Sequence, residues 1–183
     1  MLPRAMLLFA FLPAMVFGSD FTPGENLITP FEPSVYDGYT EYIKKESGYT
    51  SYLWQSDEHG FDDHYVVNVV KGKRDSLRTF RSSQDAPGKR SCKGFKSEVL
   101  VGRSRNGYLA ELWQTTCELK EMRITTIQLA IAGSDNLYHI RKLWRIPVTR
   151  EEASVWVENL DKIIVCDTRG EDHPCPTGYK KAR

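Results

Sequence analysis

The densest group of side chains that can do chemistry lies in one short polar stretch, from Asp57 to His64. It places carboxylates beside imidazoles, which together offer a divalent cation negative charge and neutral nitrogen donors. Its spacing fits neither the H-E-x-x-H pair of zinc proteases nor a calcium loop, which needs alternating acids and a distal Glu. A solvated hairpin loop is therefore the favoured interpretation. The alternative is a metal-assisted hydrolase that uses His59, Asp62, Asp63 and His64.

A second candidate is His139. In a strand, alternation places it on one face with Leu137, Arg141 and Leu143. Proton transfer would require a carboxylate that orients the ring and a nucleophile beside it, and neither follows from the pattern. The sequence has no G-x-S-x-G motif and no Gly-rich phosphate loop. We therefore expect a structural histidine, no catalytic residue and no cofactor.

The strongest charge asymmetry lies between Lys71 and Lys96, where nine basic residues face two acidic ones. If folding gathers these charges on one face, an anionic partner is indicated: lipopolysaccharide, phospholipid headgroups or an acidic protein surface. The alternative is a solvated face without a ligand. The candidate binding residues are Lys71, Lys73, Arg74, Arg78 and Arg81.

The N-terminus is typical of a secretory signal peptide, which we assign to residues 1–18. Arg4 precedes an apolar stretch, and Val16 and Gly18 are small enough for positions −3 and −1 of cleavage. No other apolar run is long enough to cross a bilayer, so we expect no transmembrane anchor after cleavage. Cleavage changes the formal net charge from +1 to 0, which argues against nucleic-acid binding. The expected location is the periplasm or the medium.

Four cysteines remain in the exported chain: Cys92, Cys117, Cys166 and Cys175. An even number in an oxidising compartment favours two disulfides, for which three pairings exist. We prefer Cys92 with Cys117 and Cys166 with Cys175, because each pair closes a local loop. No C-x-x-C motif and no repeated Cys/His pair at zinc spacing supports a redox or zinc site.

The remaining patterns predict the elements that must position these residues. The clearest is a hairpin over 124–145, followed by a helix whose start is marked by the capping-box pair Thr149 and Glu152. The spacing also predicts an earlier hairpin over 36–55, a buried strand over 65–71, a short helix over 76–83 ended by Pro87 and Gly88, and strands over 95–101 and 108–117.

The order β-β-β-α-β-β-β-β-α predicts one α+β domain. In it, two helices cover a twisted, mainly antiparallel sheet of about six or seven strands. We expect an extended leader over residues 19–35, the domain over 36–176 and a flexible basic tail over 177–183.

Several short patterns carry a resemblance: Val165-Cys-Asp-Thr-Arg169, Asp172-His-Pro-Cys-Pro176, Gly133-x-Asp135-x-x-Tyr138 and Asn106-Gly107-Tyr108, together with the helix that contains Trp156. The chain resembles a family of small proteobacterial periplasmic proteins of unknown activity. The element order is similar to that of PsbP-like domains. The resemblance implies packing and disulfide roles for these positions. From the export signal, the disulfides, the basic segment and the lack of a catalytic motif, we expect a non-catalytic periplasmic protein. It either binds an envelope component or another periplasmic protein, or serves as an accessory to a larger envelope assembly.

Overall fold

A computed structural model describes residues 21–29, 37–72 and 76–177 of the chain. The expected signal peptide, residues 178–183 of the expected tail, and Lys73 and Arg74 of the basic segment lie outside these ranges. Within them the chain is an α+β fold of nine strands and two helices. The strands are β1 (Glu25–Ile28), β2 (Tyr39–Glu46), β3 (Tyr49–Ser56), β4 (Gly60–Lys71), β5 (Gly94–Arg105), β6 (Tyr108–Leu119), β7 (Met122–Ala132), β8 (Asn136–Trp144) and β9 (Ile164–Asp167).

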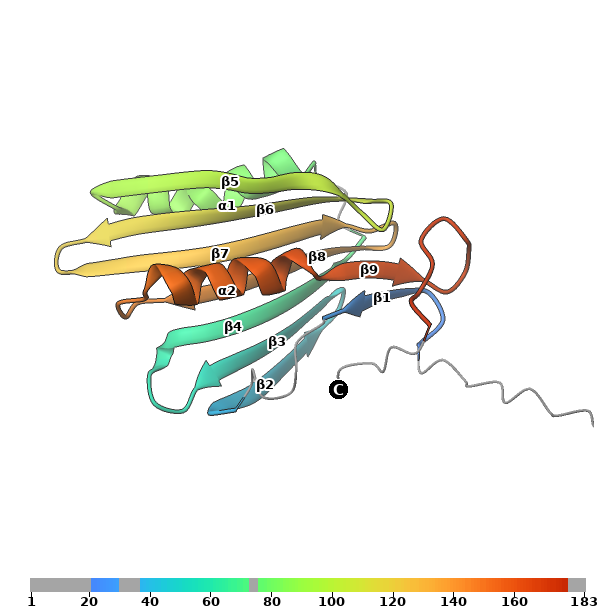
Figure 1. Cartoon of the computed structure of the whole chain (residues 1–183), viewed down its shortest axis with the longest axis horizontal. Coiled ribbons are helices and arrows are strands. Elements are labelled where there is room, and N and C mark those ends of the chain that lie inside the picture. The colour runs from blue at the N-terminus through green and yellow to red at the C-terminus, as the bar shows by residue number, and fades with distance from the viewer. Residues whose placement is uncertain (1–20, 30–36, 73–75, 178–183) are drawn as a thin grey trace, which may run out of the picture.

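Seven strands form one antiparallel sheet in the order β2-β3-β4-β8-β7-β6-β5 (Figure 1). Two hairpin-connected runs, β2 to β4 and β5 to β8, meet where β4 pairs with β8. The predicted hairpin is therefore central in the sheet, and the side chains of Ile127, Leu129, Ile131 and Ile140 are fully buried.

The two helices cover opposite faces of the sheet. Helix α1 (Leu77–Ser91) lies behind β5 and β6 in Figure 1, and α2 (Arg150–Asp161) lies in front of β7 and β8. Phe80 of α1 packs on Trp113 and Ala130, whereas Leu160 of α2 joins the larger cluster that includes Leu129. Residues on odd and even positions of the central strands thus serve two separate cores.

The start of α2 agrees with its prediction. The Thr149 hydroxyl accepts a hydrogen bond from the Glu152 N–H at 3.1 Å, and the Glu152 carboxylate accepts one from the Thr149 N–H at 2.8 Å. The capping box is confirmed, because both backbone donors at the helix start have partners.

The predicted start of α1 agrees with the structure within one residue, but the predicted end was wrong. Ser76 caps the helix, and the helix continues through Pro87 and Gly88 to Ser91. Pro87 has no N–H to donate to the carbonyl four residues earlier in the helix. Because Pro87 is exposed, water can hydrogen-bond to that carbonyl instead. The next residue, Cys92, forms a disulfide with Cys117 of β6 that holds the helix end on the sheet.

Two strands were not predicted. β1 lies within the expected extended leader, and it pairs antiparallel with β9 near the C-terminus. Each has four residues, and such short runs give little periodicity. Their pairing depends on distant parts of the chain.

Gly88 provides a test of how α1 meets the sheet. A Cβ at this position would lie 2.4 Å from the ring of Phe95 on β5. Although alanine is the better helix former by about 1 kcal/mol, we expect Gly88→Ala to lower the free energy of unfolding by about 1–2 kcal/mol through overpacking. Urea denaturation measures this change. Gly88→Ala with Phe95→Leu should recover part of the loss, and a stabilised single variant would contradict the packing.

Candidate functional site

The four residues of the predicted metal site are not brought together. His59 lies in the turn before β4 and contacts Glu58, with 3.7 Å between Nε2 and Oε1. On β4, Asp62 and His64 share one face of the sheet, and Asp63 points to the other. In the described part of the chain, no group of three or more His, Cys, Asp or Glu residues is placed to hold a metal ion. Strand alternation is the physical reason for this correction.

Asp63 instead pairs with a buried lysine. The ammonium group of Lys142, whose side chain is 1% exposed, forms an ion pair with Asp63. It also donates to the Tyr39 hydroxyl at 2.8 Å, and that hydroxyl donates to Asp63 at 2.9 Å. The Lys142 Nζ lies 4.7–5.1 Å from the ring centroids of Tyr39, Trp144 and Trp156. We call Lys142, Asp63 and these three rings the lysine cage.

Burial governs the protonation of the lysine cage. It lowers the pKa of Lys142, while the hydrogen bond and charge of Asp63 act in the opposite direction. Burial also raises the pKa of the Tyr39 hydroxyl, and the Asp63 carboxylate adds to that rise. The sequence did contain a signal, since Lys142 alternates with Ile140 and Trp144 on an inward-facing side of β8.

His64 and His139 both have neighbours that explain them structurally. The His64 Nδ1 donates to the Phe61 carbonyl at 2.9 Å. His139 bonds through Nε2 to the Gln128 side chain at 3.0 Å, and its ring lies 5.0 Å from the Phe80 ring. The expected alternation of His139 with its strand neighbours holds, and these contacts are those of a buried structural residue.

The basic segment is only partly gathered. Lys71 at the end of β4 and Arg78 on α1 are exposed. Arg81 instead forms an ion pair with Glu111 of β6, at 3.0 Å. Arg78 and Lys89 are eleven residues apart, which places them on one flank of the helix. Of the predicted anion-binding residues, the described ones thus offer two free cations.

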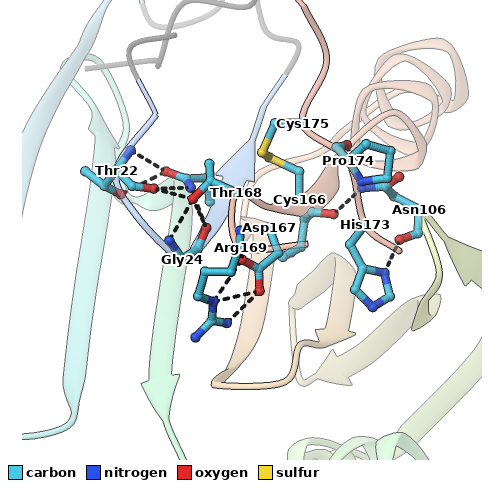
Figure 2. The surroundings of a disulfide bond; sticks show 12 residues. Thr22, Gly24, Asn106, Cys166, Asp167, Thr168, Arg169, His173, Pro174 and Cys175 are labelled. Carbon is cyan, nitrogen blue, oxygen red and sulfur yellow. Dashed lines mark hydrogen bonds and ion pairs between the residues drawn. A yellow bond between two sulfur atoms is a disulfide. The ribbon is translucent and has the colours of Figure 1, made fainter. Parts of the chain in front are cut away.

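Four of the short sequence patterns, those that contain Asn106, Asp135, Cys166 and Cys175, meet at one end of the sheet. Figure 2 shows the patterns of Asn106, Cys166 and Cys175. Cys166 and Cys175 form the second disulfide, with the partner that the sequence favoured. Inside this stapled loop, His173 stacks on Tyr108 with 3.8 Å between ring centroids, and its Nδ1 donates to the Asn106 carbonyl at 2.7 Å. The Asn106 amide donates to Val165 and Pro174.

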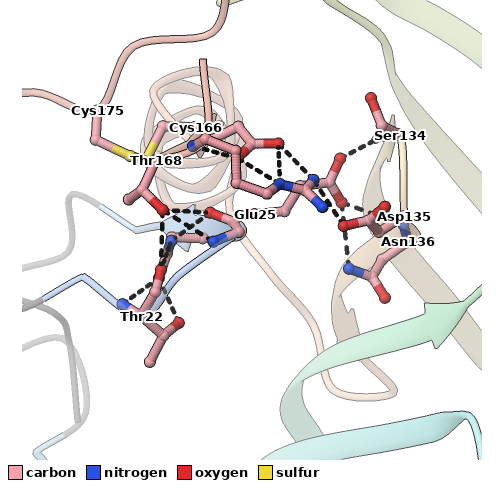
Figure 3. Close-up of polar contacts among 12 residues, drawn as sticks. Thr22, Glu25, Ser134, Asp135, Asn136, Cys166, Thr168 and Cys175 are labelled. Atoms are coloured by element: carbon pink, nitrogen blue, oxygen red, sulfur yellow. Dashed lines mark hydrogen bonds and ion pairs between the residues drawn. A yellow bond between two sulfur atoms is a disulfide. The ribbon is translucent and has the colours of Figure 1, made fainter.

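The same end holds the N-terminal strand (Figure 3). Arg169 bonds Asp135 and Asp167 at 2.7 and 2.5 Å, and Thr168 accepts from the Gly24 N–H at 2.8 Å. The Glu25 carboxylate accepts from the backbone of Ser134 and from Asn136 in the β7–β8 turn. These contacts join β1, β9 and the central hairpin. The sequence offered no signal for the role of Glu25.

Gly133 and Gly107 fit this arrangement because neither position has room for a Cβ. At Gly133 it would lie 2.6 Å from the Glu25 carboxylate, and at Gly107 it would lie 2.5 Å from the His173 ring. The residues of these four patterns thus contact one another, and a separate part of the surface is hollowed.

That other part is a groove between α2 and strands β5 to β7, with a volume of about 980 Å³. Helix α2 covers β7 and β8, and it leaves part of the neighbouring face of β5 and β6 uncovered. Residues of that uncovered face line the groove. A bulge at Leu100 breaks the pairing of β5 with β6, so Leu100 and Val101 both line it. The apolar lining consists of Leu100, Val101, Met122, Ile146, Pro147, Val148, Ala153 and Val157.

Comparison with known proteins does not assign the chain to a family. No protein-family model matches the sequence, and no curated protein matches it. No helix in the described ranges is long and apolar enough to span a bilayer.

The lysine cage can be tested by removing its charges separately and together. Asp63→Asn leaves a buried ammonium without its counterion, so we expect it to lower the free energy of unfolding by about 3 kcal/mol. Lys142→Met should cost less, because Asp63 is partly exposed and the thioether suits the aromatic surroundings. The double variant should be more stable than Asp63→Asn alone. Chemical denaturation measures all three, and a neutral Asp63→Asn would contradict the pair.

His64 gives a pH-dependent prediction. Burial lowers its pKa below the ordinary value, against the opposing hydrogen bond to Phe61. As the pH falls through about 6.5, the unfolded chain therefore binds a proton before the folded chain does, and stability decreases. NMR titration, assigned with His64→Gln, should show the lowered pKa. Unfolding measured between pH 7.5 and 5 should lose part of its pH dependence in this variant; an unchanged slope would be the contrary result.

Proposed function

We propose that this chain is an exported, non-catalytic protein of the bacterial cell envelope, and that it binds an envelope component or periplasmic partner in the groove beside α2. The groove carries the proposal, because it combines an apolar lining with charged side chains at its rim. Two disulfides support an oxidising location, and the resemblance to small periplasmic proteins agrees with it. We also propose that the fold is of the PsbP-like type, as the order of its elements suggests.

Binding is preferred to catalysis because the polar groups best suited to acid–base work are engaged elsewhere. Asp63 and Lys142 neutralise each other within the lysine cage. The imidazoles of His64 and His139 are buried on the sheet face opposite α2, where each has a hydrogen-bond partner. None of these four residues lines the groove.

A second candidate surface is the basic flank of α1, formed by Arg78 and Lys89. Both side chains are exposed and on the same side of the helix. An anionic envelope surface fits this flank, as the charge of the segment led us to expect.

Site-specific photo-crosslinking in the periplasm separates the two surfaces. A benzophenone amino acid at Ser154, an exposed groove residue of α2, should yield a crosslinked product. The same group at Ser82, which is exposed on the basic flank of α1, reports on the second surface. Products from Ser82 alone would favour the basic flank. The absence of products from Ser154 would contradict the groove as the binding site.

A further inference from the structure

The charges of the groove are concentrated at one end. Arg123 of β7, Arg145 after β8 and Arg150 at the start of α2 all line it. Arg145 approaches Asp62 at 3.6 Å. Within the described ranges, Arg123 and Arg150 form no ion pair. This end therefore offers exposed guanidinium groups that have no protein counterion.

Beyond the groove, ion pairs join the end of α2 to β5. Asp161, one helical turn beyond Val157, bonds Arg103 at 2.7 Å and Arg105 at 2.6 Å. Arg105 also donates to the Leu160 carbonyl at 2.6 Å. An occupant whose head lies at the arginines can extend over Val101 and Val157, which also line the groove.

The net charge of the lining narrows the class of occupant. Three arginines and two acids, Glu121 and Glu158, line the groove, which leaves an excess of one positive charge. Because Arg145 has Asp62 as a counterion, Arg123 and Arg150 are the groups left to bind the head of an anionic occupant. A guanidinium also binds a carboxylate through two parallel hydrogen bonds. The volume of about 980 Å³ lies at the upper end of small-molecule pockets.

Resting on the function proposed above, we propose that the groove binds a single-chain amphiphile of the fatty-acid class. Its carboxylate lies at Arg123 and Arg150, and its alkyl chain lies along Val101, Ala153 and Val157. The arginine end provides recognition of the head, and the apolar lining provides affinity for the chain. A long alkyl chain with a single anionic end matches both properties of the groove.

Calorimetric titration of the full exported chain with decanoate, dodecanoate and dodecan-1-ol tests this assignment below the micelle concentration. Each additional pair of methylenes should tighten Kd about tenfold. Arg123→Gln should weaken dodecanoate about tenfold and leave dodecan-1-ol unchanged. Ser154→Trp, which adds a ring at an exposed position of the groove, should weaken both. Arg90→Gln, exposed on α1 across the sheet, is the charge-matched control and should change neither.

The outcomes separate this inference from the proposed function. Equal affinity for the alcohol and the carboxylate would overturn it, as would tighter binding of dodecyl phosphate or of an acidic amphipathic peptide. If Ser154 crosslinks in cells while no alkyl carboxylate binds, the groove has a different ligand and only this inference fails. If neither occurs, the function fails with it.

Discussion

The interaction on which much of this structure depends is the buried charge of Lys142. An ammonium group without water is stable only if a counterion and electron-rich surfaces replace its hydration shell. Asp63 supplies the charge, and the rings of Tyr39, Trp144 and Trp156 supply the surfaces. These residues come from β4, β2, β8 and α2, so meeting this requirement fixes four elements relative to one another.

The position of α2 links this cage to the groove. Trp156 faces the lysine cage, and its neighbour Val157 lines the groove on another side of the helix. Farther along, Asp161 holds the end of α2 on β5. These ion pairs hold the end of α2 against β5, and the preceding part of the helix borders the groove. The groove has arginines near the start of α2 and an apolar lining along the helix.

The other end of the sheet is held by a different mechanism. Polar side chains bind the two short strands β1 and β9 to the central hairpin, and the Cys166–Cys175 disulfide holds the loop after β9 on that strand. Glu25, Arg169 and Asn106 add polar contacts to the burial of Ile28 and Val165, which lie in these two strands. The sequence patterns around Gly107 and Gly133 therefore mark places where the structure leaves no room for a side chain. These patterns reflect how the two ends of the chain pack on the sheet.

Local chemistry in the sequence determined the elements whose partners are near in the chain. The Thr149–Glu152 capping box, the hairpin after Ala132 and the face of His139 follow from spacing alone. Tertiary structure decided everything that requires distant partners. It extended α1 past Pro87 because Cys117 and Phe95 hold its end, and it paired β1 with β9. It also placed Asp62 and His64 on one sheet face and Asp63 on the other, and it brought arginines from three parts of the chain to one groove. The reason is that spacing in the sequence predicts which face of an element a side chain occupies, but not which distant element packs against that face.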